Sequence, residues 1–79
     1  MTDTGVREAL EARGISGISV VIPAYKSSAT LPGLVAELHR FVQPLVDGFE
    51  IVIVDDGSGD GTWETIEELA RNDGSVRGL

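Results

Sequence analysis

Residues 51–67 read IVIVDDGSGDGTWETIE and hold the side chains with the clearest capacity for chemistry. Two adjacent carboxylates, Asp55 and Asp56, follow an apolar run, and glycines then alternate with polar residues before a helix-like stretch. An ionised carboxylate only accepts hydrogen bonds, so it would select a nucleobase edge that presents an N–H group, such as N3–H of uracil or N1–H of guanine. The same letters are also compatible with calcium loops and dinucleotide loops, so three interpretations compete.

A calcium-binding loop is one alternative, because Asp56, Ser58 and Asp60 fall at its first, third and fifth ligand positions. Glu67 would supply the twelfth position of such a loop. An EF-hand loop, however, is entered from an amphipathic helix, whereas the residues before Asp56 include FEIVIV, which is typical of a strand. We therefore expect no calcium site at these residues.

A dinucleotide-binding loop is a second alternative, since Gly57 and Gly59 follow a strand-like run. Thr62, however, stands where the third glycine of G-x-G-x-x-G belongs, and the two carboxylates would repel a pyrophosphate. The chain contains no Gly-Lys-Ser or Gly-Lys-Thr, which excludes a P-loop. The third interpretation is a carboxylate that recognises a base beside an aromatic ring.

The hydrophobic pattern predicts the elements that position these residues. Ile18–Ile22 is expected to form a strand buried on both faces, Phe49–Val54 is a second strand with apolar residues at successive positions, and Val76–Leu79 begins a third. Three helices are predicted: a short one over Thr4–Arg13, one that Thr30 opens and that ends at Pro44 and Asp47-Gly48, and one that Asp60 or Thr62 caps and Gly74 stops.

Apolar strands separated by amphipathic helices are typical of a parallel β-α-β-α-(β) sheet with right-handed crossovers. The carboxyl ends of parallel strands lie along one edge of the sheet, where open α/β sheets bind ligands. Pro23-Ala24-Tyr25-Lys26 leaves the first strand and Asp55-Asp56-Gly57-Ser58 leaves the second. We therefore expect these two loops to be neighbours, with Tyr25 able to pack against a base whose N–H group a carboxylate accepts.

Two stretches, VVIPAYKSSATLPGLVAEL and FEIVIVDDGSGDGTWETIEELA, together resemble the N-terminal part of family 2 glycosyltransferases, GT-A fold enzymes that include dolichol-phosphate mannosyltransferase-like proteins. The resemblance covers residues 17–79 and leaves residues 1–16 as an N-terminal extension. It implies the Rossmann-like half of a GT-A (nucleotide-diphospho-sugar transferase) fold. It also implies transfer of a sugar from a nucleotide-activated donor to an acceptor, a lipid phosphate or a saccharide, with this chain supplying the nucleotide-binding half.

The resemblance also assigns roles to residues of the two loops. Pro23, Ala24 and Tyr25 would line the base pocket, Asp56 would hydrogen-bond the base, and Asp55 would support its loop. Lys26-Ser27 stands where the family often has Asn-Glu, so a carboxylate near the nucleotide is missing.

The family also leads us to expect a divalent metal, Mg²⁺ or Mn²⁺. Its ligands and the catalytic base are absent from these 79 residues, so the chain alone is expected to be inactive. The alternative is a non-catalytic truncated remnant or a small nucleotide-binding module.

The charge and hydrophobicity of the chain limit the kinds of partner that it is expected to bind. With 13 acidic and 6 basic residues the formal net charge is -7, which argues against nucleic acid and anionic membrane surfaces as partners. No apolar run approaches the roughly 20 residues of a membrane span, and the N-terminus lacks the apolar core of a secretory signal. We therefore expect a cytoplasmic chain, or one at the cytoplasmic face of the membrane within a longer parent.

Further expectations concern the sheet and two helical side chains. Right-handed crossovers would place the two longer helices on one face of the sheet and leave only the short N-terminal helix for the other, so self-association through an uncovered face is expected. Trp63 is interpreted as a core anchor of its helix, and His39 as a solvated residue without a partner.

Overall fold

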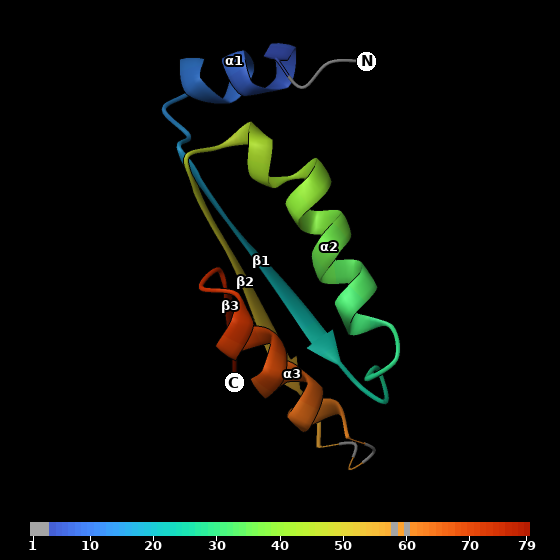
Figure 1. The fold of residues 1–79 in the computed structure, drawn as a ribbon. Helices are drawn as coiled ribbons and strands as arrows, with labels where there is room; N and C mark the ends of the chain where they lie inside the picture. The colour runs from blue at the N-terminus through green and yellow to red at the C-terminus, as the bar shows by residue number, and fades with distance from the viewer. Residues whose placement is uncertain (1–3, 58, 60) are drawn as a thin grey trace.

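The strands of the computed structural model are β1 (Gly17–Ala24), β2 (Gly48–Asp55) and β3 (Val76–Gly78), within a description that covers residues 4–57, 59 and 61–79. They form one parallel sheet in the order β1-β2-β3 (Figure 1). The remaining elements are the helices α1 (Thr4–Ala12), α2 (Leu31–Phe41) and α3 (Thr62–Asn72) and the 3₁₀ turn η1 (Gln43–Leu45). This arrangement confirms the predicted parallel β-α-β-α-β fold.

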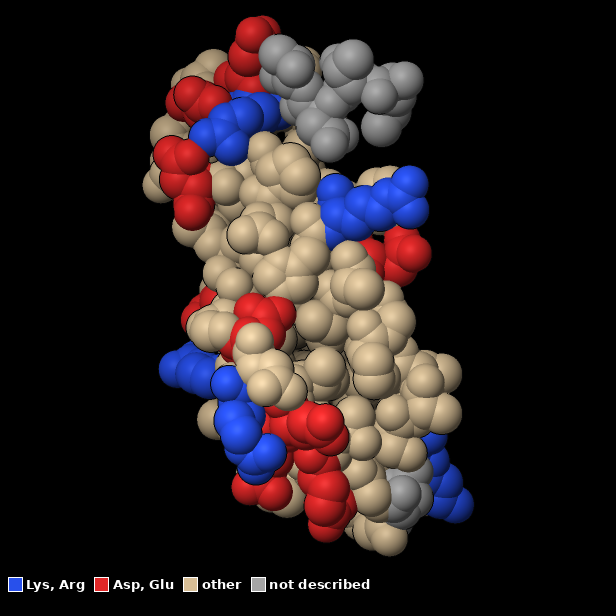
Figure 2. Space-filling model, viewed as in Figure 1, with Lys and Arg blue, Asp and Glu red and all other residues tan. Residues whose placement is uncertain are grey.

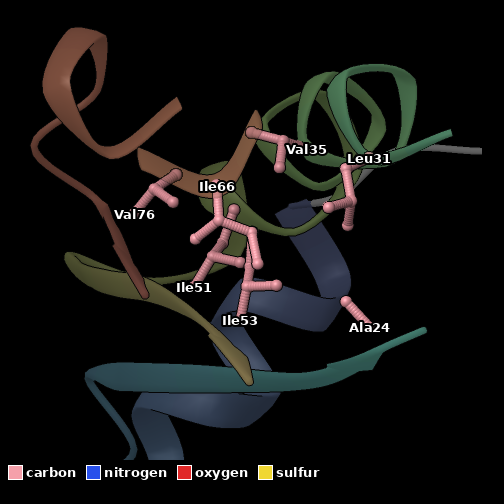
Figure 3. Close-up of a cluster of buried hydrophobic side chains, with 7 residues drawn as sticks. All are labelled: Ala24, Leu31, Val35, Ile51, Ile53, Ile66 and Val76. Carbon is pink, nitrogen blue, oxygen red and sulfur yellow. The ribbon is translucent and has the colours of Figure 1, made fainter. Parts of the chain in front are cut away.

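The core lies between the sheet and the two longer helices (Figure 3). Ile51 and Ile53 of β2 and Ile66 of α3 are fully buried, because β2 is the central strand and α3 crosses above it. The other buried members of the cluster are Ala24, Leu31, Val35 and Val76. Burying an aliphatic side chain of this size contributes about 1.5–3 kcal/mol, so this cluster is the main source of the fold's stability.

Helix α2 ends before the predicted boundary at Pro44 and Asp47-Gly48. The helix opens at Leu31 after Thr30, as expected, but it ends at Phe41, and Leu45 lies in the separate turn η1. Pro44 causes this break, since it has no N–H group and disfavours helical geometry at the residue before it.

Helix α3 begins differently from either predicted cap. Thr62 is its first residue, and the N-cap position is held by Gly61, whose φ of 91° lies in the left-handed region that glycine adopts without strain. The expectation that Thr62 caps the helix is therefore wrong, and Asp60, the other predicted cap, lies outside the described residues. Acidic and basic side chains gather over this helix (Figure 2), whose exposed glutamates are Glu64, Glu67 and Glu68.

The first strand is not buried on both faces, contrary to prediction. Its burial alternates along the chain, and Val21 is 63% exposed, because α2 and α3 cover only one face of the sheet. Helix α1 does not cover the other face either. It lies across the end of the sheet against η1 (Figure 1), where Arg7 donates to the carbonyl oxygen of Pro44 at 3.0 Å and pairs with Asp47.

Two predicted side-chain environments are also wrong. Trp63 is 38% exposed rather than a core anchor, because it lies at the margin of α3 over the short strand β3. His39 is half-buried and has two partners, Gln43 and Asp73, each 2.5 Å from a ring nitrogen. No helix in the described part of the chain has the length and apolarity needed to cross a membrane.

Candidate functional site

The two loops predicted to form the site lie side by side at the carboxyl edge of the sheet. Ala24 at the end of β1 is in register with Asp55 at the end of β2. The pairing continues one residue further, since the N–H group of Asp56 donates to the carbonyl oxygen of Ala24 at 3.0 Å. The expectation that these loops are neighbours is thus confirmed, and the sheet itself fixes their separation.

The first loop presents an aromatic ring to solvent. Tyr25 is 56% exposed, directly after Ala24, which is buried in the core. Pro23 is exposed on the uncovered face of the sheet, so the side chains of Pro23 and Ala24 point to opposite sides of β1. Of the three residues predicted to line a base pocket on this loop, Tyr25 therefore offers the free surface on which a base could pack, while Ala24 contributes backbone.

The turn after Tyr25 has an unusual backbone. Lys26 has a φ of 50°, and it is the one non-glycine residue with positive φ in the described part of the chain. A positive φ costs a residue with a Cβ about 1–2 kcal/mol, so neighbouring groups must hold the Lys26 backbone in this conformation. The hydroxyl of Ser27 does so by accepting from the N–H group of Tyr25 at 3.2 Å and donating to the carbonyl oxygen of Tyr25 at 2.9 Å. The Lys26 ammonium lies 5.4 Å from the Tyr25 ring centroid.

The two carboxylates of the second loop have different surroundings. Asp55 is half-buried, and its Oδ1 accepts from the N–H group of Gly57 at 3.1 Å, which is the geometry of a side chain that holds a turn. Asp56 is exposed, and its carboxylate has no hydrogen-bond partner among the residues that the structure describes. One carboxylate is thus engaged with its own loop and the other is available to a ligand.

Metal binding has no visible basis in this part of the molecule. Across residues 4–57, 59 and 61–79, no three His, Cys, Asp or Glu side chains are grouped so that they could hold an ion. Ser58 and Asp60, which belong to the calcium-loop alternative, lie outside the described residues. We therefore assign no metal ligand among these described residues.

Sequence reasoning missed the residues that join the two loops. Thr62 is 1% exposed, and its Oγ1 accepts from the N–H group of Ser27 at 3.2 Å. In the sequence Thr62 is interpreted as a departure from a glycine motif and as a candidate helix cap, and Ser27 as part of a departure from Asn-Glu. No local pattern indicates that residues 35 positions apart make this contact.

The exposed ring of Tyr25 and the exposed carboxylate of Asp56 thus lie at the carboxyl edge of a parallel α/β sheet, where open sheets of this kind bind ligands. The profile of the family described as "Glycosyl transferase family 2" matches residues 19–79, so the chain belongs to glycosyl transferase family 2. Its parallel sheet is the Rossmann-like half of the GT-A fold that this membership implies.

Two curated proteins similar to the chain carry the same name. An undecaprenyl-phosphate 4-deoxy-4-formamido-L-arabinose transferase of Aeromonas hydrophila subsp. hydrophila is 40% identical over 58 residues, which are 73% of this chain and 18% of that protein. The protein of the same name from Pseudomonas aeruginosa (strain LESB58) is 45% identical over 59 residues, which are 75% of this chain and 17% of that protein. The chain thus spans less than a fifth of these relatives' length, and no solved structure matches it significantly.

Proposed function

We propose that this chain forms the nucleotide-binding part of a glycosyltransferase that moves a sugar from a nucleotide-activated donor to a lipid phosphate. Membership of glycosyl transferase family 2 supports the reaction class. The observation that carries the nucleotide-binding role is the contact between the two loops. The 3.0 Å bond from Asp56 N–H to the carbonyl oxygen of Ala24 holds the free Asp56 carboxylate next to the loop that bears Tyr25.

In the proposed complex the base packs against Tyr25 and donates an N–H group to the Asp56 carboxylate. Aromatic packing contributes apolar contact with every base, so it supplies affinity without selecting among them. The carboxylate supplies selection, because it attracts N3–H of uracil or N1–H of guanine and faces an acceptor nitrogen in cytosine or adenine. Asp55 holds the loop through Gly57, and Pro23 and Ala24 fix the path of the chain into Tyr25.

The acceptor and the place of action are inferred from the relatives. Their names specify undecaprenyl phosphate, a long polyprenyl chain with one phosphate group. We therefore infer a polyprenyl phosphate as acceptor in preference to a saccharide, and a protein that works at the cytoplasmic face of a membrane. We assign neither the catalytic base nor the metal that the family leads us to expect to any of these 79 residues.

The test is calorimetric titration of the chain with UDP, GDP, CDP and ADP. We expect UDP or GDP to bind more tightly than CDP and ADP. Hydrogen bonds to charged groups contribute about 1.5–3 kcal/mol, so Asp56→Asn should weaken binding of the preferred nucleotide roughly 10- to 150-fold. Asn keeps the shape of the side chain, but it removes the charge and turns one acceptor oxygen into an NH₂ donor.

Asp55→Asn is the matched control, since it makes the same change one residue away. It should lower the melting temperature, because the bond to Gly57 N–H is weakened, with a smaller effect on affinity. Binding of none of the four nucleotides would contradict the proposed function. Equal affinity of wild type and Asp56→Asn would contradict the role of Asp56 in base recognition.

A further inference from the structure

The contact between Ser27 and Thr62 joins the start of α3 to the loop that carries Tyr25. Thr62 is the only fully buried polar residue among the described residues, and it lies at the first position of α3. A polar side chain is costly to bury unless it is hydrogen-bonded, and here the Thr62 hydroxyl accepts from Ser27 N–H. The site thus contains a buried tie between two segments that the sequence separates by a helix and a strand.

Ser27 also forms hydrogen bonds with two other segments of the backbone. Its hydroxyl makes both backbone contacts with Tyr25, at 3.2 Å and 2.9 Å, and so closes the turn around Lys26. Its carbonyl oxygen accepts from the N–H groups of Thr30 and Leu31, each at 3.0 Å, at the start of α2. The position of Ser27 therefore determines the position of Tyr25, and Thr62 is the residue of α3 that holds Ser27.

We propose that Thr62 is a positioning residue of the nucleotide site, one that fixes Tyr25 relative to Asp56 without touching the nucleotide. The inference rests on the proposed function, because Tyr25 and Asp56 are the groups that would contact the base. Ligand affinity rises when a loop is ordered before binding, since the cost of ordering it is no longer set against the contacts. Because the φ of Lys26 is unfavourable, we expect the loop to relax once the hydrogen bond between Ser27 and Thr62 is removed.

Thr62→Val removes the hydroxyl and keeps a β-branched side chain, whereas Thr62→Ser keeps the hydroxyl. Thr65→Val is the matched control, because it makes the same change one turn further along α3. The first measurement is amide hydrogen exchange by NMR. In Thr62→Val we expect the Ser27 amide to exchange about 3- to 10-fold faster and the Tyr25 resonances to shift. The amides of Ile51–Ile53 should be unaffected, and Thr62→Ser and Thr65→Val should resemble wild type at Ser27.

The second measurement is the affinity of the same variants for UDP and GDP. We expect Thr62→Val to bind the preferred nucleotide about 3- to 10-fold more weakly, with Thr62→Ser within about twofold of wild type. A merely structural role would lower the melting temperature of Thr62→Val without changing the affinity of the folded protein, and that result would overturn the proposal. An unchanged Ser27 amide and unchanged Tyr25 signals in folded Thr62→Val would overturn it as well.

The two measurements separate this inference from the proposed function. If wild type binds neither nucleotide, the proposed function fails, and with it the nucleotide role of Thr62, while the exchange data still decide whether Thr62 holds the Tyr25 loop. If Thr62→Val does not fold, the exchange rate of the Ser27 amide in wild type shows whether Thr62 holds the Tyr25 loop. A protected Ser27 amide supports the tie, and an amide that exchanges at the rate of an open loop overturns it.

Discussion

Gly78 lies where β3 passes directly beneath α3, and its lack of a side chain allows the two elements to pack. A methyl group on Gly78 would overlap Cγ2 of Ile66 and lie 3.3 Å from the Trp63 ring. Ile66 is fully buried, so its side chain would have to shift against its core neighbours to admit the methyl group. The glycine is therefore needed for close packing, not for an unusual backbone conformation.

Substitution of Gly78 by alanine is accordingly predicted to destabilise the chain. Overpacking a core costs about 1–3 kcal/mol, which outweighs the roughly 0.5–1 kcal/mol that alanine gains over glycine in a strand. Gly33→Ala is the control, since Gly33 lies in α2 with no atom close to the position of an added methyl group. In urea unfolding we expect Gly33→Ala to be at least as stable as wild type. Wild-type stability of Gly78→Ala would refute the packing argument.

At the scale of elements, His39 joins the end of α2 to the end of α3. Its ring nitrogens lie 2.5 Å from Gln43 Oε1 and from Asp73 Oδ2, and its ring meets the edge of Phe49 with centroids 5.4 Å apart. Both polar partners present oxygen, so a protonated imidazole can donate to both. The hydrogen bonds to Gln43 and Asp73, with the charge of Asp73, raise the pKa of His39 above its ordinary value although burial opposes this.

The shift makes the stability of the chain depend on pH. Because the folded-state pKa of His39 is raised above 6.5, its contribution is fully present below that pH and is lost as the pH rises through the folded-state value. Burial raises the pKa of Asp73, but hydrogen bonds from Ser75 and His39 outweigh it, so the pKa lies below 3.8. The contribution of Asp73 is therefore present above 3.8 and is lost as the pH falls through its folded-state pKa.

We therefore expect the free-energy difference between wild type and His39→Gln to be largest between about pH 4 and 6.5 and to shrink as the pH rises toward 9. His39 is the single histidine of the chain, so no other imidazole contributes to this change. Urea unfolding of both proteins across this range measures the difference. An equal difference at pH 5.5 and pH 9 would show that the charge of His39 has no part in joining the helices.

At the scale of the whole molecule, one face of the sheet remains without a covering layer. Both longer helices lie on the opposite face, and α1 lies at the end of the molecule, which measures 43 × 22 × 20 Å (Figure 1). The open face is polar toward one end, where Glu50 accepts from Ser19 at 2.7 Å and lies 4.0 Å from Arg77. Toward the carboxyl edge it is apolar, with Val21 63% and Val54 36% exposed.

An apolar surface of this kind favours association, so we predict that the chain self-associates or packs loosely at micromolar concentration. Sedimentation equilibrium should give a weight-average mass above that of the monomer, and Val21→Thr should lower it. Threonine keeps the preference for a strand while making the surface polar. Val6→Thr, on α1 and away from the open face, is the control and should leave the mass unchanged. A monodisperse monomer with a sharp cooperative melt would contradict the prediction.

The hydrophobic pattern of the sequence was sufficient to predict the order and type of the elements and the proximity of the two loops at the carboxyl edge of the sheet. Strands with apolar residues at successive positions, alternating with helices that carry one apolar stripe, are typical of a parallel sheet on which the helices pack. In a parallel sheet the carboxyl ends of β1 and β2 must lie at one edge, so the meeting of the Tyr25 loop with Asp55 and Asp56 followed from the pattern alone.

Which side chains are buried, and which groups form hydrogen bonds across the fold, depends on how the elements pack against one another. The sequence predicted burial of β1 on both faces, yet burial depends on what covers a face, and α2 and α3 cover only one. His39 and Thr62 have partners 34 and 35 residues away, and such partners are set by how α2, α3 and the loops pack. Local composition cannot encode these contacts, because they arise when elements distant in the chain are brought within hydrogen-bond distance by the shared core.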